Sequence, residues 1–244
     1  MSFCGMMTSR SRANGALPSS DALAVLDRLL WGSAVDDLML FHMARTEPSR
    51  MGFLLAGGKS SRMGSDKAFL DCGGQTLLDR ALTVMGAVCD RVAIVGDPAR
   101  FARCEFPKQG SVVADIFPGC GPLAGIHAAL VHSSAPLNLM LAVDMPFVSG
   151  ELLAFLFAAA ESTDATITVP RTSRGLQPLC AVYRRDFCTI AEQALRAGKY
   201  KVDAAFLGVT VRVIEESELA AAGFSQQTFF NVNTPQDRLD ALSK

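Results

Sequence analysis

The chain has 244 residues, of which half are apolar and 19% are charged, so it can bury a sizeable core. Its 23 basic and 24 acidic residues leave a net charge of −1, which argues against a duplex nucleic-acid binder and favours small-molecule chemistry. No apolar run approaches the roughly 20 residues that a membrane-spanning helix needs. The seven cysteines form no CxxC pair, which is typical of reduced thiols in a cytoplasmic protein.

The beginning of the chain differs in composition from the rest. Residues 21–43 have a helical pattern, and their apolar stretch resembles a signal peptide only superficially, because charges interrupt it and no small-residue cleavage site follows. We expect residues 1–50 to be an N-terminal extension, partly disordered or helical, or the result of a start codon upstream of Met43 or Met51. Residues 51–244 are expected to form the folded domain.

From Met51 onward, short apolar runs alternate with stretches of helical periodicity. The first half of this region predicts strands at residues 52–56, 91–95, 111–114 and 137–143, and helices at 77–85, 123–131 and 151–160. The second half predicts strands at 166–169, 179–182 and 209–214, a helix at 190–195 and a last helix opened by Pro235. This alternation predicts a doubly wound, mostly parallel α/β sheet, with some antiparallel pairing among the later strands.

A glycine-rich turn follows the first predicted strand, between Leu55 and Lys67. Ligands of open parallel sheets bind at the carboxyl ends of the strands, so a ligand is expected here. Gly57 and Gly58 let the backbone approach a ligand closely and offer N–H groups to phosphate oxygens. The nearby cations match the charge of a triphosphate: Lys59, Arg62 and Lys67. The turn predicts a nucleoside triphosphate site, with a plain strand-to-helix connector as the alternative.

Two common phosphate-binding motifs are not present in this part of the sequence. Gly58-Lys59-Ser60 resembles the end of a Walker A loop, but Phe53 stands where that loop requires its first glycine. The run from Gly119 to Gly125 has one residue too many for GxGxxG and does not follow the first strand. The turn is therefore neither a P-loop nor a dinucleotide-binding fingerprint.

Aspartates follow two of the later predicted strands. Asp144 comes after the apolar strand at 137–143, where a carboxylate beside a triphosphate is suited to Mg²⁺, with a helix N-cap or turn residue as its alternative role. Asp115 follows the strand at 111–114 and is a candidate to accept hydrogen bonds from a base or sugar, or to help hold the metal. Both aspartates are expected at the same edge of the sheet.

An asparagine-rich segment precedes the last predicted helix. Pro235 suits the first turn of that helix and Thr234 suits its N-cap, so part of the segment is ordinary capping. Asn231 and Asn233 remain, and one of them is a candidate to reach a ligand.

The stretch from Leu55 to Lys67 resembles the signature of the molybdenum cofactor guanylyltransferases, Leu-Ala-Gly-Gly-x-Ser-x-Arg-Met-Gly-x-Asp-Lys. Further segments similar to that family follow in its order and at compatible spacings: Gly121–Gly125, Asp144–Pro146, Gln177–Leu179 and Asn231–Pro235. The resemblance covers residues 51 to about 242. It implies a Rossmann-like, doubly wound, mostly parallel α/β sheet of the nucleotide-diphospho-sugar transferase type.

The resemblance also implies an activity: transfer of GMP from GTP to the molybdopterin form of the molybdenum cofactor, with Mg²⁺ as cofactor and pyrophosphate as by-product. The residues expected to contact the nucleotide are Leu55, Ala56, Gly57, Gly58, Lys67, Asp115 and Asp144. The expected catalytic residues are Arg62, Lys67 and Asp144, of which Asp144 is also the metal ligand. The residues expected to face the pterin substrate are Gln177, Asn231 and Asn233.

The chemistry of that reaction suits these residue types. A phosphate nucleophile is already ionised at neutral pH, so the reaction requires no general base and no histidine or paired-carboxylate constellation. The implied partners are GTP and the molybdopterin cofactor, with cofactor-delivery proteins and molybdoenzymes as further candidates. A nucleic-acid partner and a membrane partner are not expected, and the expected location is the cytoplasm.

One departure from the family pattern and several rival functions remain. Family members often have an asparagine at the end of the second strand, where this chain has Val95-Gly96-Asp97, so this chain lacks the asparagine for a nucleotide contact at that position. The related cytidylyltransferase usually reads Ala-Ala-Gly where this chain has Ala56-Gly57-Gly58, and Gly121–Gly125 also favours guanine. A sugar-phosphate nucleotidyltransferase and a non-catalytic nucleotide-binding protein of the same fold also compete with the guanylyltransferase interpretation.

Overall fold

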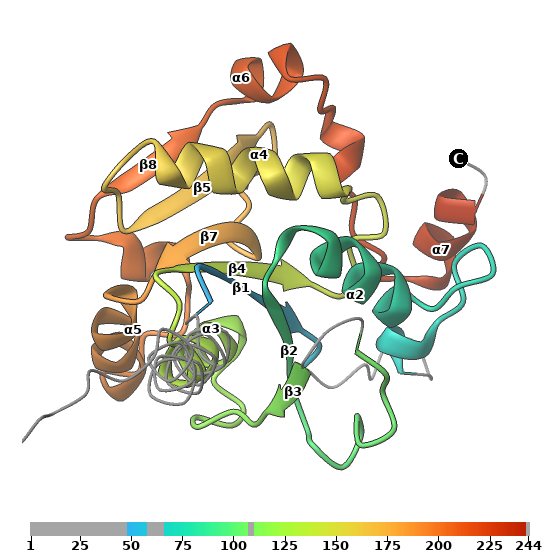
Figure 1. The fold of residues 1–244 in the computed structure, drawn as a ribbon, viewed down its shortest axis with the longest axis horizontal. Helices are drawn as coiled ribbons and strands as arrows, with labels where there is room; N and C mark the ends of the chain where they lie inside the picture. Colours follow the sequence, from blue (N-terminus) through green and yellow to red (C-terminus); the bar gives the residue numbers. More distant parts are fainter. Residues whose placement is uncertain (1–47, 58–65, 107–109, 243–244) are drawn as a thin grey trace, which may run out of the picture. The chain divides into compact units, whose positions relative to one another are not determined.

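The computed structural model (Figure 1) describes three stretches of the chain: residues 48–57, 66–106 and 110–242. All of them lie within one unit, residues 47–244. The helix predicted at residues 21–43 lies outside the described residues. The division into an extension at residues 1–50 and a domain at residues 51–244 stays a prediction, although the first strand already begins at Arg50.

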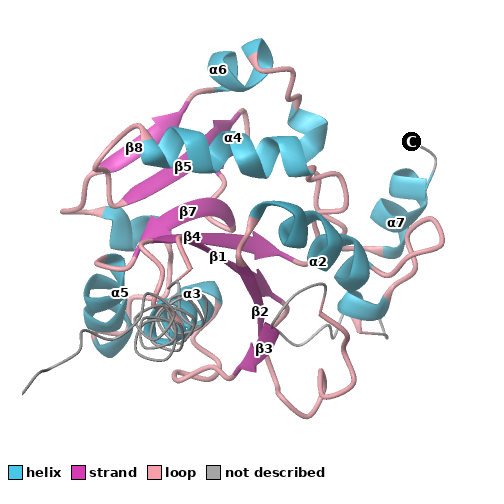
Figure 2. Cartoon of the chain, viewed as in Figure 1, coloured by secondary structure: helices cyan, strands magenta, loops and turns pink. Residues whose placement is uncertain are grey.

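Strands and helices alternate along the first half of the domain (Figure 2). In chain order they are β1 (Arg50–Leu55), η1 (Lys67–Phe69), α2 (Leu77–Val88), β2 (Arg91–Val95), β3 (Gly110–Val113), α3 (Pro122–His132), β4 (Leu137–Ala142) and α4 (Gly150–Glu161). The second half contains β5 (Ile167–Thr172), β6 (Gly175–Leu176), β7 (Cys180–Arg184), α5 (Phe187–Arg196), η2 (Asp203–Phe206), β8 (Val211–Ile214), α6 (Glu216–Ala221), η3 (Gln226–Phe229) and α7 (Pro235–Leu242).

Local sequence signals set the ends of several helices. The Thr76 hydroxyl accepts a hydrogen bond from the Asp79 N–H and so caps α2, and the Ser149 hydroxyl caps α4 in the same way. Pro122 opens α3, where its missing N–H is no loss. These residues therefore mark where α2, α3 and α4 begin.

The strands form one sheet in the order β3-β2-β1-β4-β7-β5-β6, with β8 paired to β5. The four strands of the first half are all parallel to one another. The later strands mix both senses, because β7 runs antiparallel to β4 and β5, while β8 is parallel to β5. The predicted doubly wound, mostly parallel sheet with some later antiparallel pairs is confirmed.

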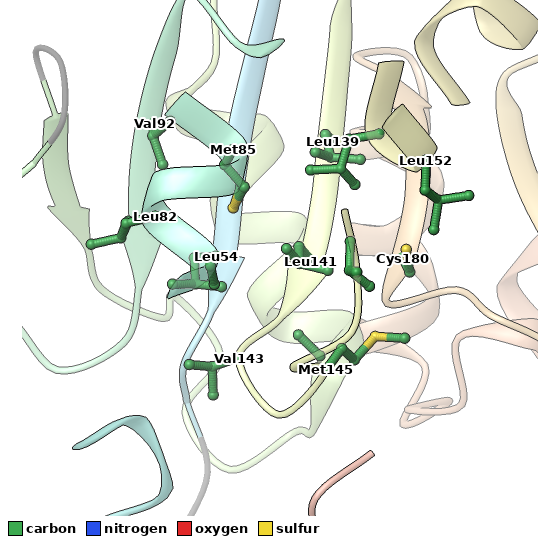
Figure 3. Close-up of a cluster of buried hydrophobic side chains, with 14 of the residues drawn as sticks. Leu54, Leu82, Met85, Val92, Leu139, Leu141, Val143, Met145, Leu152 and Cys180 are labelled. Atoms are coloured by element: carbon green, nitrogen blue, oxygen red, sulfur yellow. The ribbon is translucent and has the colours of Figure 1, made fainter. Parts of the chain in front are cut away.

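Helices cover both faces of the sheet, with α2 and α4 on one face and α3 and α5 on the other (Figure 1). Alternate strand residues supply the two cores, since neighbouring side chains point to opposite faces. Leu54 belongs to the first core and Phe53 to the second. Figure 3 shows the first core, in which strand residues meet helical ones: Leu54, Val92, Leu139, Leu141, Leu82, Met85 and Leu152. β4 is buried along its whole length, as its continuous apolar run predicts.

The predicted and observed elements differ in both halves of the domain. In the first half β3 begins at Gly110 rather than at residue 111 and α2 continues to Val88 rather than residue 85. In the second half α5 begins at Phe187 rather than at residue 190, and β8 begins at Val211 rather than at residue 209. The short elements β6 and α6 and the three 3-10 helices are not predicted. Each is too short to show a periodic apolar pattern, because a two-residue strand or a single helical turn buries only one or two side chains.

Within the described residues, no helix is long and apolar enough to cross a membrane.

Candidate active site

The parallel strands bring the predicted ligand-binding residues to one edge of the sheet. In β1, Leu55 is paired with Val95 of β2 on one side and with Ala142 of β4 on the other. The ladder continues past the strand ends, since the Ala56 N–H donates to the Val95 carbonyl over 3.0 Å and the Val143 N–H donates to the Leu55 carbonyl over 3.2 Å. The chain is therefore held rigidly up to the points where the glycine turn and Asp144 begin.

Lys67, Asp144 and Asn233 meet at this edge although they are far apart in sequence. The Lys67 Nζ lies 3.5 Å from the Asp144 Oδ2 and donates to the Asn233 Oδ1 over 2.7 Å. The side chains of Lys67 and Asp144 are both mostly buried, with 20% and 22% of their surface exposed. We call these three residues the lysine cluster. In this cluster a cation, a carboxylate and an amide lie within contact distance of the lysine nitrogen.

Three local structures hold the lysine cluster in place. Asp66 is the N-cap of η1, the 3-10 helix that begins with Lys67. The Val232 N–H donates to the Asp144 carbonyl over 2.8 Å, so the asparagine segment runs beside Asp144. The Asp237 carboxylate accepts hydrogen bonds from the Asn233 and Thr234 N–H groups, both over 2.8 Å. Each residue of the cluster therefore belongs to a segment whose backbone is fixed by hydrogen bonds.

The segment that follows Val232 behaves as the sequence predicts. The Thr234 hydroxyl accepts from the Asp237 N–H over 3.1 Å and caps α7, which begins at Pro235. The helices η1 and α7 are neighbours, on the right of Figure 1, because Arg238 of α7 donates to the Asp71 carbonyl over 2.8 Å. The contact between Asn233 and Lys67 therefore joins two well-anchored elements.

The Asp144 carboxylate lies in surroundings that are unusual for an aspartate. Burial raises its pKa above the ordinary value, while the Lys67 charge and hydrogen bond partly offset that rise. A carboxylate that is partly stripped of water and not fully neutralised by its neighbour favours the approach of a further cation. The residue therefore combines the right position and the right charge for a metal ion bound with phosphates.

Asp115 lies at the same edge but in different surroundings. It follows β3, which is separated from β4 by β2 and β1. Its Oδ1 is buried and has no hydrogen-bond partner among the residues that the structure describes. Burial raises the pKa of this carboxyl group too. An unpaired acceptor of this kind is costly to the folded protein and is suited to a ligand that brings a donor.

Glycines make room around Asp115. A Cβ on Gly57 would lie 3.7 Å from the Asp115 Oδ2, and a Cβ on Gly125 would lie 3.8 Å from its Oδ1. The same Cβ on Gly125 would lie 3.4 Å from Leu55, so part of the reason for this glycine is the packing of α3 against the sheet. Gly121 has a φ of 76° and ends the turn before α3. We call Gly57, Asp115 and Gly125 the aspartate cradle.

Gln177 is two residues before Leu179, which is hydrogen-bonded to the end of β4. The Leu179 carbonyl accepts a hydrogen bond from the Ala142 N–H over 2.8 Å, which puts the start of β7 beside the end of β4. The Gln177 side-chain amide donates to the Thr172 hydroxyl over 3.0 Å and is engaged in the β5–β6 hairpin. Asn231 is half-buried and precedes Val232, which bonds to Asp144.

Part of the predicted glycine turn lies outside the described residues, namely Gly58, Lys59 and Arg62. The structure does describe Asp97, which stands near the position of the asparagine expected from the family resemblance. Its Oδ1 accepts a hydrogen bond from the Ala99 N–H over 2.9 Å, so the side chain shapes its own turn.

Arg100 is a neighbour of the site that no sequence signal indicated. Its guanidinium group is ion-paired with both oxygens of Asp66, and its Nη1 donates to the Ala56 carbonyl over 2.9 Å. Arg100 thereby links the residue before Lys67 to the end of β1. Nothing in the spacing of Ala56, Asp66 and Arg100 predicts this contact, because it depends on how β1 and β2 pair.

Comparison with known proteins identifies the family. Residues 52–209 match the model of the MobA-like NTP transferase domain. A protein of Pelotomaculum thermopropionicum named "Probable molybdenum cofactor guanylyltransferase" is 39% identical over 191 residues, which cover 78% of this chain and 90% of that protein.

Solved structures agree with this assignment. The crystal structure of molybdopterin-guanine dinucleotide biosynthesis protein A from Archaeoglobus fulgidus is similar with a TM-score of 0.69 and 27% identity, covering 79% of this chain and 97% of that one. The 2-C-methyl-D-erythritol 4-phosphate cytidylyltransferase of Thermus thermophilus has a TM-score of 0.58 and 24% identity over 81% of this chain and 98% of its own, a likeness of fold alone. The chain belongs to the MobA-like NTP transferases, in the family of the molybdenum cofactor guanylyltransferases.

Proposed function

We propose that this protein transfers GMP from GTP to the molybdopterin form of the molybdenum cofactor, giving molybdopterin guanine dinucleotide and pyrophosphate. The observation that carries the proposal is the lysine cluster, in which Lys67, Asp144 and Asn233 meet beside the glycine turn. Membership of a family whose named relatives are molybdenum cofactor guanylyltransferases supports the choice of substrates. The nucleotidyltransferase class of the reaction follows from the family itself.

The nucleotide would bind along the carboxyl ends of β1, β3 and β4. Leu55, Ala56 and Gly57 would contact it through backbone groups at the end of β1, together with Gly58 from the adjacent part of the turn. The aspartate cradle would receive its sugar or base, because Asp115 offers a buried acceptor without a partner among the described residues and Gly57 leaves space beside it. Lys67 would contact its phosphates, with Arg62 as a second cation.

The Asp144 carboxylate and its surroundings fit a bound Mg²⁺. Mg²⁺ is typically held by one or two carboxylates together with substrate phosphates and water, so a single well-placed aspartate is sufficient. The Asp144 carboxylate is mostly buried and its pKa is raised by burial, which leaves it in need of positive charge. When bound, Mg²⁺ would supply Lewis-acid stabilisation of the α-phosphate oxygens.

The transfer step needs positioning and charge rather than a base. A terminal phosphate oxygen of the pterin substrate attacks the α-phosphorus of GTP in line, and the bond from that phosphorus to the bridging oxygen breaks as pyrophosphate leaves. Lys67 and Arg62 would reduce the repulsion between the two anionic substrates. Asp144 would keep Lys67 directed at the phosphates, since the Nζ lies 3.5 Å from its Oδ2.

The pterin substrate would bind on the β7 and α7 side of the lysine cluster. Gln177 and Asn231 are its proposed contacts, because both lie on segments that bond to the end of β4 or to Asp144. Asn233 would serve both substrates, since its Oδ1 already accepts from Lys67 over 2.7 Å. The proposed setting of the reaction is the cytoplasm, with cofactor-delivery proteins and molybdoenzymes as partners.

The direct test is a product assay with the full chain. The protein is incubated with Mg²⁺, purified molybdopterin cofactor and each of the four nucleoside triphosphates separately, and the products are identified by mass spectrometry. We expect a guanine dinucleotide with GTP only. A cytosine dinucleotide would assign the protein to the cytidylyl reaction instead, and no product with a cofactor that is active in a control enzyme would leave only nucleotide binding.

A further inference from the structure

Arg100 lies in a turn after β2 that is stabilised by hydrogen bonds among the residues of the turn. The Asp97 Oδ1 accepts from the Ala99 N–H over 2.9 Å, and the Arg100 N–H donates to the Asp97 carbonyl over 3.1 Å. Gly96 extends the ladder, because its N–H donates to the Val113 carbonyl over 2.9 Å. These bonds fix the backbone from which the Arg100 side chain starts.

The Arg100 guanidinium makes contact with two separate segments. Its Nε and Nη2 are paired with the two oxygens of Asp66, and its Nη1 donates to the Ala56 carbonyl over 2.9 Å. Its side chain is 24% exposed and that of Asp66 is 29% exposed, so the pair is largely removed from solvent. A planar group with donors in fixed directions is required to reach all three acceptors at once.

Asp66 links Arg100 to Lys67, because it caps the short helix that begins with Lys67. Its Oδ1 also accepts from the Ala68 N–H over 3.1 Å, and its carbonyl accepts from the Phe69 N–H over 3.1 Å, which makes it the N-cap of η1. Lys67 is the first residue of η1, and its Nζ lies 3.5 Å from the Asp144 carboxylate. The position of Lys67 therefore depends on where Asp66 is held.

An aromatic platform supports the same arrangement. The Arg100 guanidinium carbon lies 4.8 Å from the centroid of the Phe101 ring, which is buried. That ring packs against Phe69 at the end of η1, with the two ring centroids 5.9 Å apart. A Cβ on Gly96 would lie only 2.7 Å from the Phe101 ring, so the glycine allows the ring to pack against η1.

We propose that Arg100 is a positioning residue, which anchors Asp66 to the end of β1 and so holds Lys67 in place to contact the phosphates of the nucleotide. The proposal rests on the proposed function, since it assumes that Lys67 acts on the triphosphate. Arg100 touches Ala56 and Asp66 on opposite sides of the glycine turn, and it acts on the substrate only through them.

The test uses Arg100→Met and Arg100→Lys in the full chain, with Arg103→Met as the matched control. Arg103 lies in the same turn, and its side chain is exposed. We expect both Arg100 variants to lose roughly 10- to 100-fold in kcat/KM for GTP, because methionine removes the charge and lysine lacks the planar group that reaches all three acceptors. The KM for the pterin substrate should stay within about twofold, and Arg103→Met should resemble the wild type.

A double-mutant cycle separates positioning from a general loss of stability. If Arg100 acts through Lys67, Arg100→Met should have little further effect on GTP turnover in a Lys67→Met background. Full additivity of the two losses would overturn the proposal, as would wild-type kinetics for Arg100→Met. Circular dichroism checks that the variants fold, and Arg100→Lys takes the place of Arg100→Met in the cycle if the latter does not.

Failure of the proposed function can be distinguished from failure of this inference. If the wild-type protein makes no guanine dinucleotide but binds another triphosphate, the proposed function fails, and the same cycle is measured on the Kd of that triphosphate. Coupling between Arg100 and Lys67 in that Kd would support the positioning role. Independent effects, or none, would overturn it.

Discussion

The lysine cluster and the aspartate cradle lie at the same edge of the sheet, and each contains a partly buried aspartate, but the two carboxylates have different neighbours. In the cluster, the Asp144 carboxylate has a cation 3.5 Å away, and that cation is in turn bound to Asn233. In the cradle, the Asp115 Oδ1 is buried with no hydrogen-bond partner among the described residues. Burial raises the pKa of both carboxyl groups, but among the described residues only Asp144 has a neighbouring charge that opposes the rise.

Under the proposed function, the two aspartates would have different roles. A carboxylate beside a lysine is organised for phosphates and a metal ion, whose charges must be balanced during the reaction. The Asp115 carboxylate, whose buried oxygen has no donor within the described part of the chain, would suit a neutral ligand group that donates hydrogen bonds. A buried acceptor without a donor typically costs a folded protein roughly 1–3 kcal/mol, and a donor from a bound nucleotide would recover that cost.

The largest effect is expected from Asp144→Asn. We predict a fall in kcat of at least roughly 100-fold, since the change removes the proposed metal ligand and the partner of Lys67 together. Steady-state kinetics at saturating GTP and Mg²⁺ measure it. Asp164→Asn is the matched control, because Asp164 is exposed and precedes β5, away from the carboxyl ends of the parallel strands. Near-normal turnover of Asp144→Asn at ordinary Mg²⁺ concentrations would remove Asp144 from the metal site.

Lys67→Met is expected to have the next largest effect. We predict a loss of roughly 10- to 100-fold in kcat/KM for GTP, because a charged phosphate contact disappears. Asn233→Ala then tests what the amide contributes: if it only orients Lys67, its effect vanishes in the Lys67→Met background, and if it also binds the pterin, the KM for the pterin rises in both backgrounds. An unchanged kcat/KM for Lys67→Met would place the lysine outside the site.

Asp115→Asn is expected to separate binding from stability. We predict that GTP affinity falls by about tenfold, because a neutral amide accepts hydrogen bonds less strongly than a carboxylate. The Tm of the ligand-free protein should rise, because the change removes a partly buried charge whose Oδ1 has no donor among the described residues. Titration calorimetry and thermal unfolding measure the two quantities, and a lower Tm with unchanged affinity would contradict the role of the cradle.

The pH dependence of that Tm difference follows from the direction of the pKa shift. Folding raises the pKa of Asp115, so its ionised form destabilises the folded protein at neutral pH. The destabilisation disappears as the pH falls through the raised pKa towards the ordinary value of an aspartate. The Tm advantage of Asp115→Asn should therefore be largest at neutral pH and shrink on acidification. A difference that grows on acidification would mean that the Asp115 pKa is lowered.

Gly57→Ala is expected to have the smallest effect on binding. Its new methyl group would make only ordinary contact with Asp115, so the fold should tolerate it while GTP affinity falls roughly three- to tenfold, the worth of one hydrogen bond. Gly121→Ala should instead lower stability, by about 1 kcal/mol, because an alanine at a φ of 76° is strained. A Gly57→Ala variant that binds GTP normally would show that the backbone does not approach the nucleotide there.

The first half of the fold could be predicted from sequence because its signals are local. β4 is buried on both faces and has an unbroken apolar run, and Pro122, Thr76 and Ser149 mark helix starts by their own chemistry. Thr234 and Pro235 similarly predicted the start of α7, and the structure confirms that cap. The predicted end of the first strand, residue 56, lies one residue beyond the observed end of β1 at Leu55, because the apolar run stops at the glycines.

The contacts that complete the site could not be predicted in the same way. Asn233 reaches Lys67 only because α7 packs beside η1, and no pattern within either segment indicates that pairing. The ion pair of Arg100 with Asp66 likewise depends on the alignment of β1 with β2. The family resemblance was also the only sequence-based reason for Gly121 and Gly125, whereas the structure explains them by a positive φ and by packing on Leu55.

The division between the two aspartates is tested most directly by the Mg²⁺ dependence of GTP binding, measured by calorimetry for the wild type, Asp144→Asn and Asp115→Asn. Mg²⁺ should tighten GTP binding to the wild type. In Asp144→Asn that dependence should be lost, while Asp115→Asn should bind GTP more weakly with and without Mg²⁺ and keep the wild-type response to the ion. An identical Mg²⁺ response in all three proteins would contradict the account, because it would remove the metal from Asp144.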